Sequence, residues 1–129
     1  MHITPINPAH EIYPATADYV HAMQVTAPTQ WLFISGTMGL ANDSRAAATL
    51  DGQLALIWHN IRRILQEAEM APDNIVRVTS YLTDAAYAEA NQNAREVALG
   101  HRPVATTTAV IVGTLNSDWL VEVEAIAAA

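Results

Sequence analysis

The stretch from Arg102 to Ala128 limits the possible folds more than any other part of the chain. It holds two runs rich in β-branched and other apolar residues, Val104–Val112 and Trp119–Ala127. The segment Gly113–Asp118 between them is rich in residue types that tolerate tight or left-handed backbone. The stretch is therefore predicted to form a β-hairpin.

The second run places two acids on one face of its strand. Side chains alternate between the faces of a strand, so Glu122 and Glu124 share a face with Leu120 and Ile126. Exposed acids are the norm, and Glu122 is interpreted as a solvated surface residue. Glu124 lies in a strand expected at the centre of a sheet, which makes it the better candidate for an acid that lines a cavity.

Length and composition indicate one domain that associates with other copies. A chain of 129 residues forms a single domain, here 1–129, and buries about two-thirds of its unfolded surface on folding. Hydrophobic residues make up 51% of the chain and charged residues 15%, which is apolar for a monomer of this size. We therefore expect an oligomer.

The charged residues argue against nucleic acid as a partner. The chain has no lysine, its 6 arginines stand against 13 acids, and its net charge is −7. Affinity for nucleic acid depends on cations that neutralise phosphates, and these are scarce here. No nucleic-acid partner is expected.

The sequence also lacks the marks of several other classes of protein. Without cysteine there is no disulfide framework, thiolate nucleophile or cysteine-ligated metal. The N-terminus lacks the basic start and apolar core of a signal peptide, and no apolar run approaches the ~20 residues of a membrane span. We expect a cytoplasmic protein that does not bind membranes.

The N-terminal part of the chain is predicted to be extended. Its prolines make Met1–Ala17 an arm, with at most a short edge strand at Ile3–Ile6. Asp18–Thr26 alternates as a strand does, and Trp31–Ser35 has the composition of a short buried strand. These two strands are expected to pair as a hairpin.

Two predicted helices follow, separated by a strand. Apolar residues recur at three- and four-residue steps over Leu50–Met70, which predicts an amphipathic helix. Ile75–Leu82 is β-branched and aromatic, which predicts a strand. A second helix is predicted at Ala85–Leu99, because capping residues precede this segment and Gly100 follows it.

The resulting order of elements, β-β-α-β-α-β-β, predicts an α+β fold. A mixed β-sheet with both helices on one face is a two-layer arrangement, and it buries the apolar stripe of each helix. We therefore expect a single two-layer domain.

The chain carries none of the common short motifs of catalysis. It has no glycine-rich phosphate loop, no His-x-x-x-His pair on a helix and no Gly-x-Ser-x-Gly elbow. Its 5 histidines are scattered singly, and His59 is interpreted as a surface residue of the first helix. His21 shares a predicted strand face with Tyr19, which fits either ordinary half-buried packing or a functional site. No metal site is predicted.

An ordered set of short segments runs through nearly the whole chain from Asp18. Its members are Ile34-Ser35-Gly36, Ala68-Glu69-Met70, Asp73-Asn74-Ile75-Val76, Tyr81-Leu82-Thr83-Asp84, Tyr87 with Ala90-Asn91, Arg102-Pro103, and Val123-Glu124-Ala125-Ile126-Ala127. Together they resemble the reactive-intermediate deaminase family, also called the Rid or YjgF family.

The resemblance implies a chorismate-mutase-like fold and a homotrimer whose sheets form a central barrel, with three clefts at the subunit interfaces. In that family the cleft hydrolyses enamines and imines derived from amino acids, such as 2-aminoacrylate, to the keto acid and ammonia. The reaction uses no cofactor. The resemblance therefore implies self-association, a small-molecule ligand and no cofactor for this chain.

The resemblance also implies a set of site residues. The positions that match the family pattern are Tyr19, Ser35, Gly36, Asn91 and Glu124. Of these, Glu124 is the candidate catalytic residue, because a buried acid can orient water and transfer a proton. The others are candidate substrate contacts.

The departures from the family pattern concern the contact with the substrate. Family members that deaminate have an arginine two residues after the Arg-Pro pair, where it forks onto the substrate carboxylate, and this position is Ala105. Alanine cannot replace a bidentate guanidinium–carboxylate pair. Thr106 and Thr107 stand where the family favours a serine and then a small residue, and His21 stands where it usually has a glutamine. Arg102 is expected to belong to the turn.

Three functional hypotheses remain. The first is a family trimer whose cleft hydrolyses or binds an imine, enamine or related metabolite without the usual carboxylate clamp, and Glu124 favours it. The alternative is a non-catalytic ligand-binding or regulatory trimer, which Ala105 favours. A ribonuclease is disfavoured by the net charge of −7 and the lack of lysine.

Overall fold

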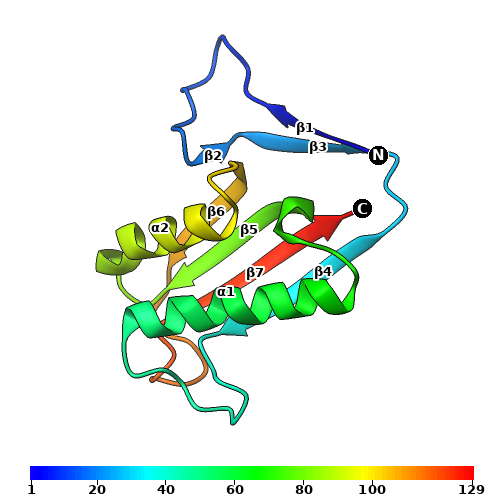
Figure 1. The fold of residues 1–129 in the computed structure, drawn as a ribbon. Coiled ribbons are helices and arrows are strands. Elements are labelled where there is room, and N and C mark those ends of the chain that lie inside the picture. The colour runs from blue at the N-terminus through cyan, green and yellow to red at the C-terminus, as the bar shows by residue number, and fades with distance from the viewer.

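The computed structural model describes residues 1–129 and divides them into strands, two α-helices and short 3-10 turns (Figure 1). The elements are β1 (His2–Ile6), β2 (Tyr19–Val20), β3 (Ala22–Thr26), β4 (Trp31–Met38), α1 (Leu50–Glu67), β5 (Ile75–Leu82), α2 (Ala88–Ala98), β6 (Val104–Val110) and β7 (Val121–Ala128). Both predicted helices are confirmed, as is the strand predicted at Ile75–Leu82.

The core of the domain is a five-stranded mixed sheet in the order β2-β6-β5-β7-β4. The central strand β5 pairs in parallel with β6 and antiparallel with β7. Strands β1 and β3 form a separate antiparallel ribbon that stands apart from the helices (Figure 1). The N-terminal arm therefore adds a ribbon to the domain rather than an edge strand to the main sheet.

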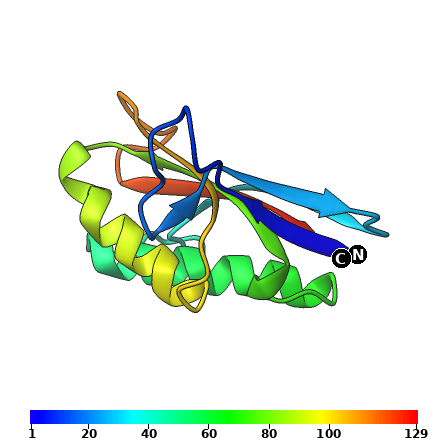
Figure 2. The ribbon, with the colours of Figure 1, turned by 90° about the horizontal axis from the view of Figure 1, so that it is seen from above.

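Both helices cover the same face of the main sheet (Figure 2). Helix α1 begins where the hydroxyl of Thr49 accepts a hydrogen bond of 3.1 Å from the Gly52 amide. The residues of α1 that are buried against the sheet are Gln53, Leu54, Ile57, Trp58, Ile61 and Leu65. Each large apolar side chain among them contributes roughly 1.5–3 kcal/mol on leaving water. The predicted α+β class with two layers is thereby confirmed.

The predicted C-terminal hairpin is wrong. Strands β6 and β7 do not pair with each other, because β5 lies between them and pairs with both. Helix α2 carries the chain from β5 to the parallel strand β6, and its Ala90, Ala94 and Ala98 pack partly buried against the core while Val97 stays exposed. The turn-rich segment after β6 is a loop that crosses over β5 rather than a tight turn, so its composition misled the prediction.

The predicted hairpin of Asp18–Thr26 with Trp31–Ser35 is also wrong. The first segment breaks at His21 into β2 and β3, and β3 pairs with β1 while β4 pairs with β7. Backbone hydrogen bonds explain the direction of β4: the amides of Thr29 and Gln30 donate to the carbonyl of Ala129. These hydrogen bonds hold the start of β4 beside the C-terminal end of β7.

Candidate functional site

The sheet face that the helices leave uncovered carries the polar side chains of the central strands. We call it the open face. Arg77, Thr79 and Tyr81 alternate along β5, and their register partners lie on the same face of the neighbouring strands. Those partners are Ala105, Thr107 and Ala109 on β6, and Ile126, Glu124 and Glu122 on β7. Of the helix-facing positions in between, Val78, Val123 and Ala125 are apolar and belong to the core, whereas Ser80, Thr106 and Thr108 are polar.

Glu124 is held on the open face by a tyrosine. The hydroxyl of Tyr81 donates a hydrogen bond of 2.6 Å to Oε1 of Glu124. This hydrogen bond raises the pKa of Tyr81 above its ordinary value of 10.0, with help from burial and from the negative charge of Glu124. Both side chains are half-buried, and Glu124 lines a cavity of about 160 Å³ with Phe33, Arg77 and Ile126. The structure thus places Glu124 in a lined cavity, as the sequence suggested.

Arg77 is the cation of the open face. Its Nη2 donates a hydrogen bond of 2.8 Å to Oγ1 of Thr107. Arg77 is also the register partner of Ala105 across the parallel pair of strands, so its side chain starts beside the position that lacks arginine. Arg77 was not among the predicted site residues. The signal for it was a charged residue that alternates with the apolar residues of a central strand.

Ser35 and Gly36 form a bulge in β4. The register of β4 against β7 shifts between Ile34 and Thr37, so that one extra residue is accommodated there. A Cβ at Gly36 would lie 2.6 Å from Oε1 of Glu122. The glycine therefore lets the Glu122 side chain pack against the edge strand. Gly36 lies against Glu122, and neither Ser35 nor Gly36 lines the cavity of Glu124.

Tyr19 and Thr106 lie away from Glu124. They face the helix side of the sheet and line a cavity of about 370 Å³ beside α2. In its wall, the guanidinium of Arg95 forms an ion pair of 2.8 Å with Asp18. The side chain of Arg95 is only 4% exposed. One copy of the chain thus does not bring Tyr19 and Thr106 together with Glu124 and Thr107.

His21 lies between two tyrosines at the break between β2 and β3. Its ring centroid is 4.9 Å from that of Tyr13 and 5.8 Å from that of Tyr19, and both pairs meet edge to face. Its Nε2 is 2.8 Å from the carbonyl of Tyr13, and a carbonyl only accepts, so Nε2–H is the donor. His21 also lines a cavity of about 310 Å³ that includes Ala105 and Arg77. Both readings of His21, as packing and as part of a site, thus have support.

Asn91 is buried in α2 and stands apart from the other predicted site residues. It is 1% exposed, and neither its Nδ2 nor its Oδ1 has a hydrogen-bond partner within the chain. Buried amides normally have such partners. Asn91 lines none of the cavities described above.

Arg102 belongs to the turn, as predicted. Its Nη2 donates to the carbonyls of Pro72 and Ile75, at 2.9 and 2.8 Å. Burial lowers the pKa of its guanidinium below the ordinary value of an arginine. These contacts engage the side chain inside the protein, so it is not available on the open face.

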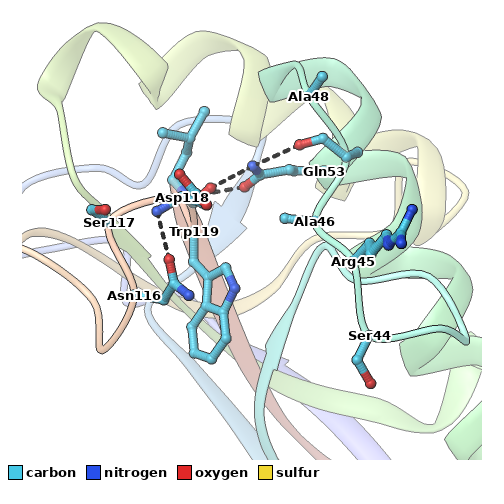
Figure 3. A pocket seen from close by; sticks show the side chains of 11 residues that line it. Ser44, Arg45, Ala46, Ala48, Gln53, Asn116, Ser117, Asp118 and Trp119 are labelled. Atoms are coloured by element: carbon cyan, nitrogen blue, oxygen red, sulfur yellow. Dashed lines mark hydrogen bonds between the residues drawn. The ribbon is translucent and has the colours of Figure 1, made fainter.

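The largest cavity lies elsewhere, between the loop before α1 and the loop before β7 (Figure 3). It measures about 570 Å³. At its edge the buried side chain of Gln53 joins the two loops. Its Nε2 donates to the carbonyls of Ala47 and Asp118, at 3.0 and 2.7 Å, and its Oε1 accepts from the amide of Leu120 at 2.9 Å. All polar atoms of Gln53 are therefore engaged, and this cavity was not predicted.

The structure contains neither a metal-binding cluster nor a membrane-crossing helix. No cluster of three or more His, Cys, Asp or Glu side chains is placed to hold a metal ion. No helix combines the length and the apolar character that crossing a membrane requires.

The fold and the open face together define an α+β domain of the Rid type. The family model described as Endoribonuclease L-PSP matches residues 9–129, and the chain belongs to that family, which is also known as the Rid or YjgF family. The resemblance stated from the sequence is thereby confirmed.

Solved structures and a curated relative agree with this assignment. The crystal structure of YyfB from Yersinia pestis, a Rid-family protein of unknown function, is similar with a TM-score of 0.86 and 22% identity, covering 100% of both chains. RidA from Psychrobacter has a TM-score of 0.74 and 19% identity, covering 89% of this chain and 97% of its own. The mitochondrial protein MMF1 from Saccharomyces cerevisiae is 28% identical over 115 residues, 88% of this chain and 77% of its own. The structural similarities, at these identities, establish the fold.

Proposed function

We propose that this protein is a homotrimer that hydrolyses small imines or enamines in clefts between its subunits. The observation that carries the proposal is the acid of the open face, Glu124, held by Tyr81 at 2.6 Å beside the cation Arg77. The open face also exposes large apolar side chains: Phe33 is 72% exposed and Trp31 is 48% exposed. Such surface favours contact with other copies of the chain.

A second copy would also supply what one copy lacks. Tyr19 and Thr106 line a cavity on the helix side of the sheet, whereas Glu124 lies on the open face. A site that uses all of these residues requires two copies. The open face of one copy would meet the sheet edge of the other, where β2 carries Tyr19. This separation supports a cleft at a subunit interface.

The chemistry needs only water and a positioned acid. Glu124 accepts a proton from a water molecule as the water oxygen bonds to the imine carbon, and the electron pair of the C=N bond moves to nitrogen. Glu124 then returns this proton to nitrogen, which gives an amino alcohol. Glu124 next takes the hydroxyl proton and passes it to nitrogen, so that the C–N bond breaks, ammonia leaves and the C=O bond of the keto product forms. Tyr81 fixes one oxygen of the carboxylate during these steps.

Two other functions remain as alternatives. A non-catalytic trimer that binds a ligand is favoured by Ala105, which offers no charge to a substrate carboxylate. The description of the family as an endoribonuclease suggests RNA as a substrate. With a net charge of −7 and no lysine, and with Arg95 and Arg102 engaged inside the protein, the chain has few cations for phosphates.

The location and partners of the protein are part of the same proposal. We still predict a cytoplasmic location, a reaction without a cofactor, and no nucleic-acid or membrane partner. The relative MMF1 is described as mitochondrial, so imaging of a tagged full chain in its own cells is the direct measurement of location.

The test of the proposed function combines assembly with turnover. Sedimentation velocity is expected to give a trimer at micromolar concentration. 2-Imino acids made by an amino-acid oxidase are trapped by semicarbazide, and wild type is expected to suppress trapping while Glu124→Gln does not. A trimer that binds 2-oxo acids but leaves trapping unchanged would support the non-catalytic alternative, and a stable monomer would contradict the proposal.

A further inference from the structure

Two cavities meet at Arg77. The cavity of about 160 Å³ that contains Glu124 and the cavity of about 310 Å³ that contains His21 and Ala105 share two residues, Arg77 and Ile126. A ligand held at Arg77 therefore reaches the acid on one side and the second cavity on the other.

The second cavity is mostly apolar. Its walls include Met23 and Val25 from the β1–β3 ribbon, Trp31 from β4, and Val76 and Ala105 from the main sheet. Arg77 supplies its only full positive charge, and the imidazole of His21 is already bonded to a backbone carbonyl. Such a lining suits an apolar group attached to an anion.

The guanidinium of Arg77 is free to bind an anion. The ion pairs of the chain join Arg45 to Asp43, Arg63 to Glu67 and Arg95 to Asp18, so no carboxylate neutralises Arg77. A guanidinium has five N–H donors, and the bond to Thr107 fixes Nη2 and orients the group. The small side chain of Ala105, the register partner of Arg77, leaves room beside it.

We propose that Arg77 binds the carboxylate of the ligand and that the ligand carries a branched or aromatic apolar side chain, which occupies the cavity lined by Met23, Val25 and Trp31. In this arrangement the carbon next to the carboxylate lies toward Glu124. The inference rests on the proposed function for the identity of the site, and it adds the residue that anchors the substrate and the class of side chain that the site accepts.

The test measures binding and turnover separately. Phenylpyruvate, pyruvate and the methyl ester of phenylpyruvate are titrated calorimetrically into the assembled protein. Wild type is expected to bind phenylpyruvate at least tenfold more tightly than pyruvate and not to bind the ester. Arg77→Gln is expected to weaken phenylpyruvate binding roughly ten- to a hundredfold, the range for hydrogen bonds to charged groups. Arg77→Lys should retain part of the affinity.

Two further variants serve as controls. Arg62→Gln removes an exposed arginine of α1 that lines a different groove, and it should bind as wild type does. Ala105→Leu keeps the charge but fills the space beside Arg77, and it should lose phenylpyruvate more than pyruvate. Circular dichroism and sedimentation show whether each variant keeps its fold and assembly.

The outcomes separate this inference from the proposed function. Arg77-dependent binding without imine hydrolysis would support the anchor while contradicting the enzyme. Unchanged hydrolysis and binding in a folded Arg77→Gln assembly would overturn the anchor while leaving the enzyme intact. Failure of wild type to bind any of the carboxylates would also overturn it. If Arg77→Gln does not fold, Arg77→Lys and Ala105→Leu decide: affinities equal to wild type in both would overturn the proposal.

Discussion

The hydroxyl of Tyr81 and the carboxylate of Glu124 are joined by a hydrogen bond of 2.6 Å across the two central strands. The pair is diagonal, because the register partner of Glu124 is Thr79. It is the only hydrogen bond that the chain gives to the Glu124 side chain. One carboxylate oxygen is thus fixed, and the other is left for water or substrate.

Tyr81→Phe is expected to impair turnover more than binding. The ring remains while the donor is lost, so Glu124 keeps its place but not its orientation. We expect kcat for imine hydrolysis to fall roughly tenfold with KM nearly unchanged, in line with the loss of a positioning contact. Steady-state kinetics of Tyr81→Phe beside Glu124→Gln measure this. Equal kcat in wild type and Tyr81→Phe would show that the hydrogen bond has no part in catalysis.

The same hydrogen bond is expected to make stability fall at alkaline pH. The pKa of Tyr81 is raised in the folded protein, above its ordinary value of 10.0. Its contribution to stability is therefore complete below pH 10, where the unfolded tyrosine is also protonated. It is lost as the pH rises through the folded pKa, because the unfolded chain then releases the proton first. Urea unfolding between pH 8 and 11 should show a shallower decline for Tyr81→Phe, and parallel curves would contradict the assignment.

Two glycines are expected to respond differently to alanine. A Cβ at Gly39 would lie 2.4 Å from the backbone Cα of Gln53 in α1, which cannot move aside. Gly39→Ala should therefore cost about 1–3 kcal/mol, the usual range for overpacking. At Gly36 the nearest atom is the flexible end of Glu122, so Gly36→Ala should cost less than about 1 kcal/mol. Thermal unfolding of both variants compares them, and the reverse order would show that the helix yields more easily than the side chain.

Gln53 is expected to be the strongest polar contributor to the loops at the largest cavity. Gln53→Ala leaves the carbonyls of Ala47 and Asp118 and the amide of Leu120 without partners, and Gln53 is 2% exposed. We expect a loss of about 2–3 kcal/mol in unfolding free energy and faster hydrogen exchange at Leu120. Gln53→Glu keeps the acceptor for Leu120 and should protect that amide better. Unchanged exchange in Gln53→Ala would mean that the loops hold without it.

Local patterns in the sequence were sufficient for both helices and several strands but not for the pairing of the strands. The stripe of α1 and the run Ile75–Leu82 carry their own periodicity, and both were predicted correctly. The insertion of β5 between β6 and β7 is a long-range choice. It depends on the crossover through α2 and on the burial of β5, and no turn residue encodes either.

The candidate site was predicted in the same uneven way. Glu124 was identified because an acid in a central strand is unusual, and its cavity is present. Arg77 and Tyr81 were not among the predicted site residues, because their position beside Ala105 and Glu124 depends on register partners from β6 and β7 that the sequence does not reveal. The separation of Tyr19 from Glu124 could not be predicted from strand periodicity either, since it depends on which face of the sheet the helices cover.

Moving the arginine from β5 to β6 is expected to restore binding that its removal abolishes. Arg77 and Ala105 are register partners on parallel strands and share the open face, so side chains from either position reach the same space. In Arg77→Gln, addition of Ala105→Arg should therefore recover most of the affinity for pyruvate.

The recovery should be smaller for phenylpyruvate, because the new side chain occupies part of the apolar cavity. Ala105→Arg alone should gain less affinity over wild type than the double variant gains over Arg77→Gln, since two guanidinium groups side by side repel each other. Calorimetric titration of the three variants against both ligands measures these differences. If the double variant binds no better than Arg77→Gln while remaining folded and assembled, the two positions do not serve one anion site, and the role assigned to Arg77 would have to be abandoned.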